Sequence, residues 1–241
     1  MEFKTETIYF VMQMKKTNTI LKTILICIAS IDIIWFFYSD LTFRRYTMLL
    51  PIPVLVLFYF LQKETKSILY LVALAAFMTA DYFFRIGGEQ FIEGVIATTI
   101  GIGLYGVIVL IKSHYISTRR ILVSTVPFLA IYMIPFIFFI DKIPDYAFSQ
   151  IVSYTFVVGY FSFLTILTYV SKPSLITKKL LIAGVSTIGM GMLYGIYLFV
   201  FTNRIVGIGA NMFFMISNYS MWRYMMIKDT MKKENDDMFT L

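Results

Sequence analysis

Long apolar segments alternate with short polar segments along nearly the whole chain. A helix needs about 20 mainly apolar residues to cross a bilayer, and eight segments reach or approach that length. They are residues 19–38, 47–62, 67–84, 91–111, 121–140, 147–170, 180–201 and 206–227. The pattern predicts an all-α, polytopic membrane protein with eight transmembrane helices in one bundle.

The eight apolar segments lie between a polar amino-terminal segment and a charged carboxy-terminal tail. We expect a polar segment at 1–18, the transmembrane domain at 19–227 and a charged tail at 228–241. The first apolar segment follows Lys15 and Lys16, as in a signal peptide, but it continues past Asp32 through Trp35. That length favours a retained helix over a cleaved signal.

The composition agrees with a lipid environment. Hydrophobic residues make up 59% of the chain and charged residues only 15%, against about a quarter charged in soluble domains. The net charge of +7 does not indicate nucleic-acid binding, because the basic residues lie between apolar segments and form no stripe. With one cysteine, Cys27, and one histidine, His114, we predict no cofactor, and no metal site unless carboxylates alone hold the metal.

The basic residues also predict the topology. If eight segments span, 16 of the 21 Lys and Arg fall on the side of the two termini. The positive-inside rule then places both termini in the cytoplasm. We expect a multi-pass protein of the cell membrane, which in a bacterium would be the inner membrane. The sequence does not indicate its oligomeric state.

Three carboxylates within or beside the spans are the candidate catalytic residues, since ionisable groups at membrane depth are costly and commonly functional. Asp81 lies at the end of the third segment, and the alternative to a catalytic role is an ion pair with Arg85 one helical turn later. Glu93 opens the fourth, where it would also suit the helix dipole. Asp32 lies in the first, where a structural hydrogen bond is the alternative.

Four polar residues within the spans are candidates for substrate binding: Tyr105, Tyr194, Asn218 and Tyr219. Tyrosines are also ordinary residues of membrane interfaces. Asn218 is the stronger signal, because an amide in lipid needs a partner. The glycines of the fourth and seventh segments predict close packing of helices.

The turn after Asp81 carries a family resemblance. Ala80-Asp81 ends one segment, Phe84 follows, Phe91 to Gly94 open the next, and Tyr105 lies farther along it. In these residues, in the stretch from Thr47 to Pro53 and in Ser217-Asn218, the chain resembles the integral membrane lysoplasmalogenase-like family, whose members have eight spans.

The resemblance implies cleavage of the vinyl ether of lysoplasmalogens, with release of a fatty aldehyde. That chemistry needs an acid and a base. The chain departs from the family at three positions: Ile102 replaces a histidine, Met48 replaces a lysine, and no acid occurs at Gly191-Met192 in the seventh segment. Asp32 or Glu93 would have to supply the second carboxylate.

Three functions therefore remain open. The first is a lysoplasmalogenase-like hydrolase that uses Asp81. The second is a non-catalytic protein that binds a membrane lipid or lysolipid, or stabilises a membrane complex. The third is a small-solute transporter, which the absence of inverted-repeat symmetry disfavours.

Overall fold

The computed structural model describes residues 17–31, 33–34, 49–62, 66–86, 90–112, 121, 123–126, 128–129, 137 and 140–238, without the side chains of Arg85 and residues 228–238. All regular structure in this part of the chain is helical, which confirms the all-α prediction. The helices, after one at Thr17–Ile31, are α3 (Pro51–Gln62), α4 (Ile68–Ile86), α5 (Phe91–Lys112), η2 (Ile140–Lys142), α7 (Asp145–Ser171), α8 (Leu175–Gly195), η3 (Ile196–Val200) and α9 (Arg204–Met238).

The chain divides into two compact units, Met1–Lys66 and Ser67–Leu241. In the first unit, α3 begins at Pro51, where a proline is tolerated because the first helical N–H groups lack an internal partner. One side of α3 is buried, while Leu57 and Leu61 are exposed. Lys66 lies over the ring of Phe60, 4.5 Å from its centroid.

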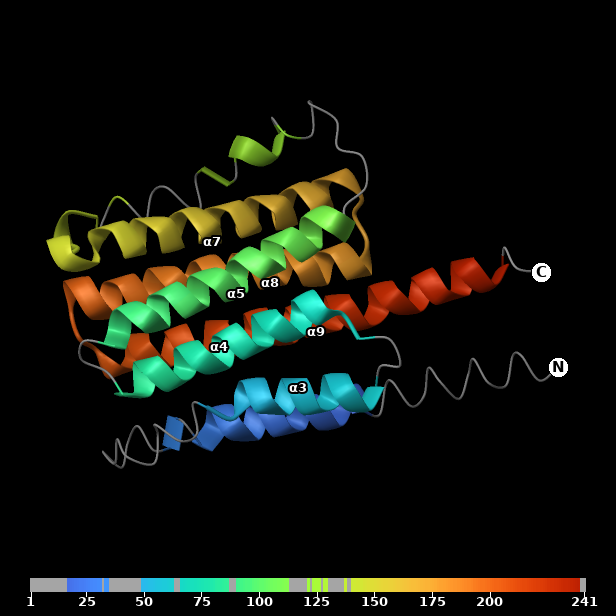
Figure 1. Ribbon diagram of the computed structural model, residues 1–241, viewed down its shortest axis with the longest axis horizontal. Coiled ribbons are helices and arrows are strands. Elements are labelled where there is room, and N and C mark those ends of the chain that lie inside the picture. Colours follow the sequence, from blue (N-terminus) through green and yellow to red (C-terminus); the bar gives the residue numbers. More distant parts are fainter. Residues whose placement is uncertain are drawn as a thin grey trace. The chain divides into compact units, whose positions relative to one another are not determined.

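In the second unit, α4, α5, α7, α8 and α9 run alongside one another (Figure 1). Their directions follow from the side chains that the glycines of one helix meet on its neighbour. These pairs are Gly94 with Phe84, Gly101 with Phe77, Gly103 with Val157, Gly106 with Tyr160, Gly184 with Thr165, Gly191 with Tyr154, Gly189 with Phe213 and Gly209 with Leu193. Hence α5, α7 and α9 are parallel, and α4 and α8 run opposite to them.

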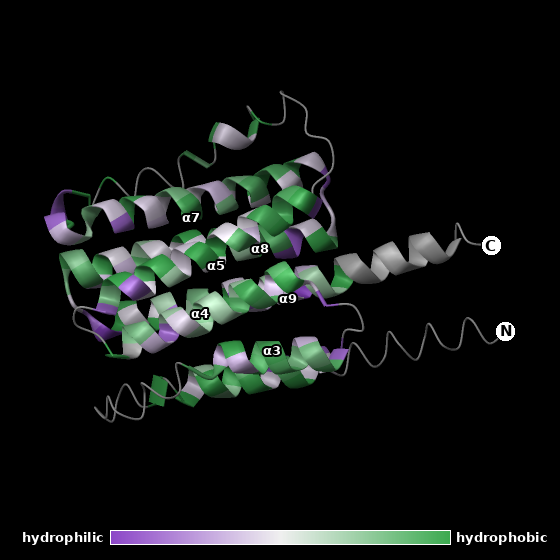
Figure 2. Ribbon diagram, viewed as in Figure 1, coloured by the Kyte–Doolittle hydropathy of each residue, from purple (hydrophilic) through white to green (hydrophobic). Residues whose placement is uncertain are grey.

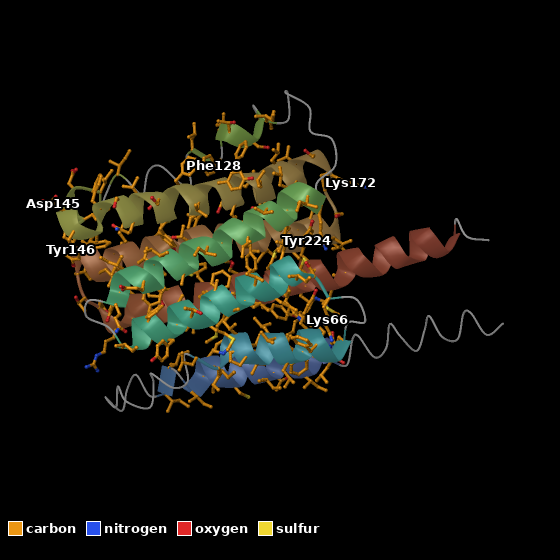
Figure 3. All side chains as sticks on the ribbon, in the orientation of Figure 1. Lys66, Phe128, Asp145, Tyr146, Lys172 and Tyr224 are labelled. Carbon is orange, nitrogen blue, oxygen red and sulfur yellow. The ribbon has the colours of Figure 1, made fainter. Side chains whose placement is uncertain are left out.

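The parallel arrangement of α5 and α7 requires the chain to return along the unit between residues 112 and 145. The predicted fifth segment, 121–140, lies mostly outside the described residues, but 121, 123–126, 128–129 and 137 are helical. The ring of Phe128 packs on that of Phe163 in α7, with centroids 5.4 Å apart (Figure 3).

Local sequence explains where several helices begin and end. A capping box starts α8: Ser174 Oγ accepts the Thr177 N–H at 3.1 Å, and Thr177 Oγ1 accepts the Ser174 N–H at 2.9 Å. Asn203 Oδ1 accepts the Ile205 N–H at 2.8 Å, which caps the start of α9. Helix α9 continues to Met238, beyond the predicted end at residue 227.

Three described helical segments are long and apolar enough to cross a membrane: Phe91–Lys112, Asp145–Ser171 and Leu175–Val200. Three shorter apolar helices are Thr17–Ile31, Pro51–Gln62 and Ile68–Phe84. Hydrophobic residues dominate the helices of the second unit, and hydrophilic residues gather near the helix ends (Figure 2).

Candidate functional site

Asp81 lies on α4, one helical turn after the buried Phe77 and toward the turn that joins α4 to α5. Its Oδ2 atom is shielded and has no hydrogen-bond partner among the described residues, whereas the residue as a whole is half-buried. An unpaired buried polar atom of this kind is uncommon in folded proteins and calls for an explanation. Asp81 is therefore the first residue of the candidate site.

Of the other two predicted carboxylates, only Glu93 lies among the described residues. Glu93 lies in the first turn of α5 and is exposed. Its neighbour Gly94 faces α4, where a Cβ atom would meet the ring of Phe84. Asp32, and the side chain of Arg85 that was considered as a partner for Asp81, lie outside the described residues.

Tyr105 and Asn218, both predicted to bind substrate, form a hydrogen bond with each other. The Tyr105 hydroxyl donates to Asn218 Oδ1 at 2.7 Å, and Asn218 Nδ2 donates to the backbone oxygen of Phe214 at 3.0 Å. Both residues are buried. Rings of Tyr70 and Phe77 pack on Tyr105, at centroid distances of 5.9 and 5.2 Å. This pair joins α5 to α9 across an aromatic core.

Hydroxyl groups continue this polar layer through α7, α8 and α9. Thr187 and Ser217 share a hydrogen bond of 2.7 Å, and the Ser217 hydroxyl lies 3.1 Å from the backbone oxygen of Ala183. On the other side of α8, Ser162 Oγ donates to the backbone oxygen of Gly184 at 3.0 Å. These buried groups hold three helices together without a charged residue.

A second polar pair lies nearer the α4–α5 turn. The Tyr194 hydroxyl donates to Asn211 Oδ1 at 2.7 Å, which connects α8 to α9. Sequence reasoning named Tyr194 but missed Asn211, which is buried. The argument that selected Asn218 applies equally to Asn211, seven residues earlier on the same helical face. The remaining candidate, Tyr219, stacks on Trp222 with centroids 6.0 Å apart.

The described part of the chain contains no group of three or more His, Cys, Asp or Glu residues that could hold a metal ion. The site residues described above can perform proton transfer, by Asp81, and hydrogen bonding, by amides and hydroxyls.

Comparison of the chain with protein-family models, with curated proteins and with solved structures gives no match.

Proposed function

We propose that the chain is an integral protein of the cell membrane. It crosses the membrane eight times and has both termini in the cytoplasm. Three helices long and apolar enough to span support this. So do large apolar side chains on the outer faces of the second unit, such as Phe156, which is 74% exposed. Soluble proteins seldom expose large continuous apolar surface.

The directions and ends of the helices support the same topology. Parallel α5 and α7 need one crossing between them, as the predicted fifth span provides. Lys172 and Tyr224 lie at one end of the second unit, and Asp145 lies at the opposite end (Figure 3). Lys112 also ends α5 at the Lys172 end, which the positive-inside rule assigns to the cytoplasm.

We propose further that the protein is a lysoplasmalogenase-like hydrolase in which Asp81 is the acid–base residue. The observation that carries this proposal is the shielded Oδ2 atom of Asp81, which has no hydrogen-bond partner in the described part of the chain. Leaving a buried polar group unpaired costs about 1–3 kcal/mol, more when it is charged. In a site that binds an amphiphile with an enol ether, this oxygen would be available to exchange a proton with the substrate. Asp81 is half-buried, so its side chain is not fully enclosed by the protein.

The resemblance implies a second carboxylate, but in the mechanism that we propose the Asp81 carboxyl acts first as the acid and then as the base. The Asp81 carboxyl donates its proton to the alkenyl carbon β to the ether oxygen, which leaves an oxocarbenium ion and a carboxylate. Water adds to the cationic carbon while the carboxylate accepts a proton from that water. The resulting hemiacetal collapses to a fatty aldehyde and the glycerophospho alcohol, and Asp81 ends protonated as it began.

The test is an aldehyde-release assay on purified protein in detergent with a lysoplasmalogen. We expect release from the wild type, loss of at least a hundredfold in Asp81→Asn, and near wild-type release from Glu93→Gln, whose exposed carboxylate serves as the matched control. Equal release from wild type and a folded Asp81→Asn variant would exclude Asp81 from the chemistry.

A second candidate function is non-catalytic lipid binding. The observation in its favour is that Tyr105 with Asn218, and Tyr194 with Asn211, already satisfy each other. If folded wild-type protein releases no aldehyde but a lysolipid co-purifies with it and is lost from Asp81→Asn, lipid binding is the better account.

A further inference from the structure

The depth of Asp81 in the second unit can be compared with residues on α9. The rings of Phe77 on α4 and Phe214 on α9 meet edge to face, with centroids 5.7 Å apart. Because α4 and α9 run in opposite directions, four residues forward from Phe77 corresponds to four residues back from Phe214. Asp81 therefore lies level with Ala210, and Asn211 is offset by about 1.5 Å along the axis.

The two polar residues also lie on facing sides of their helices. Asp81 follows Phe77 by four residues, and Asn211 precedes Phe214 by three; both spacings keep residues on one helical face. Since the rings of Phe77 and Phe214 contact each other, these spacings predict that Asp81 and Asn211 face each other one helical turn away from that contact.

The side chains at this level are shorter than those one turn deeper. Two phenylalanine rings fill the distance between α4 and α9 at the level of Phe77. At the next turn the same helices present Asp81, Ala210 and Asn211, and Asn211 is held from the α8 side by the Tyr194 hydroxyl. The residues that these helical spacings place one turn from the Phe77–Phe214 contact, Asp81, Ala210 and Asn211, are therefore polar or small.

We propose that Asn211 is the positioning residue of the Asp81 site. This rests on the proposed hydrolase function. The Asn211 carboxamide, fixed in orientation by Tyr194, holds the water that attacks the oxocarbenium ion and delivers its proton to Asp81. The Asn211 amide thereby orients the attacking water, a role that a second carboxylate would otherwise fill. In this proposal Asp81 on α4, Tyr194 on α8 and Asn211 on α9 form one site.

The juxtaposition is tested without any substrate. In a Cys27→Ser background, which removes the native cysteine, we pair Asp81→Cys with Asn211→Cys and treat the protein with a short bismaleimide. Intact mass reports whether one reagent joins both thiols. The matched control pairs Asp81→Cys with Asn218→Cys, about 10 Å farther along α9.

We expect the Asp81–Asn211 pair to cross-link at least tenfold faster than the Asp81–Asn218 pair. Equal rates, or no cross-link in the Asp81–Asn211 pair although each thiol reacts singly with the reagent, would overturn the inference.

The role of Asn211 is tested in the aldehyde assay. Misplacing a reacting group by about 1 Å can cost about a hundredfold in rate, so Asn211→Ala should lower kcat 10- to 100-fold with little change in KM. Tyr194→Phe should lower kcat less, about three- to tenfold, because it removes only the hydrogen bond that orients the Asn211 carboxamide and leaves the carboxamide itself in place. Ser220→Ala, a buried change deeper on α9, is the control and should leave kcat within twofold.

The outcomes separate the two proposals. An active wild type with an unchanged Asn211→Ala variant overturns the inference and leaves the hydrolase standing. An inactive wild type contradicts the hydrolase, and the cross-linking result then decides alone whether Asp81 and Asn211 share a site.

Discussion

Helices α7 and α8 approach so closely at Gly184 that a single methyl group should destabilise the protein. A Cβ atom at Gly184 would overlap Thr165 Oγ1 and would lie 2.9 Å from Thr165 Cβ and 3.0 Å from Thr165 Cγ2. Carbon atoms pack best at about 3.5–4.0 Å. Thr165 cannot turn aside easily, because it is β-branched, fully buried, and donates to the backbone oxygen of Ser162 at 2.7 Å.

The size of the effect follows from three contributions. Overpacking a filled core costs about 1–3 kcal/mol. Separating the helices weakens the Ser162 hydrogen bond to the Gly184 backbone oxygen, which is worth about 1 kcal/mol. Alanine is better than glycine within a helix by about 1 kcal/mol. The net expectation for Gly184→Ala is a loss of about 1–3 kcal/mol, or about 2–12 °C in the thermal midpoint.

The assay is the midpoint for loss of the monodisperse peak of detergent-solubilised protein on heating. Gly103→Ala on α5 is the matched control, because its added Cβ atom would meet only Val157 Cγ1 at 3.6 Å, an ordinary contact. We expect the control to be neutral or slightly stabilising. Thr165→Ala should reduce the cost of Gly184→Ala by removing the contacts with Oγ1 and Cγ2. If Gly184→Ala is no more harmful than Gly103→Ala, the α7–α8 packing described above is wrong.

Two further predictions concern the polar layer and the topology. Asn218→Leu removes the acceptor of the buried Tyr105 hydroxyl, so the same thermal assay should show a loss of about 1–3 kcal/mol, partly recovered when Tyr105→Phe is added; no change would mean that the bond contributes nothing. In the Cys27→Ser background, a membrane-impermeant maleimide should label Lys142→Cys in intact cells but Lys172→Cys only after permeabilisation, and the reverse pattern would invert the proposed orientation.

The sequence predicted the helices well because the apolar segments are long and their ends carry clear signals. Pro51 opens α3 and Asn203 caps α9 within a few residues of the predicted ends. The packing glycines were also predictable as a class. Their partners were not, because which side chain meets Gly184 depends on how α7 and α8 align in space, and a hydropathy pattern does not contain that information.

The candidate site was predictable only in part. Asp81 stood out because a carboxylate in an apolar helix is costly, and the structure shows a shielded oxygen there. The mutual bond between Tyr105 and Asn218 was not foreseen, since the two residues are 113 positions apart. Nor did the sequence mark the π-helical turn η3, which follows α8 directly and ends where the Phe201 N–H bonds to the backbone oxygen of Ile196.

The most direct test of the central claim follows the proton that Asp81 is proposed to donate. Purified protein is incubated with a lysoplasmalogen in D2O, and the released aldehyde is reduced at once so that it cannot exchange. We predict aldehyde from the wild type carrying one deuterium on the carbon next to the carbonyl, and no enzymatic product from Asp81→Asn. Aldehyde without that deuterium, or with the same yield from the folded variant, would contradict the account.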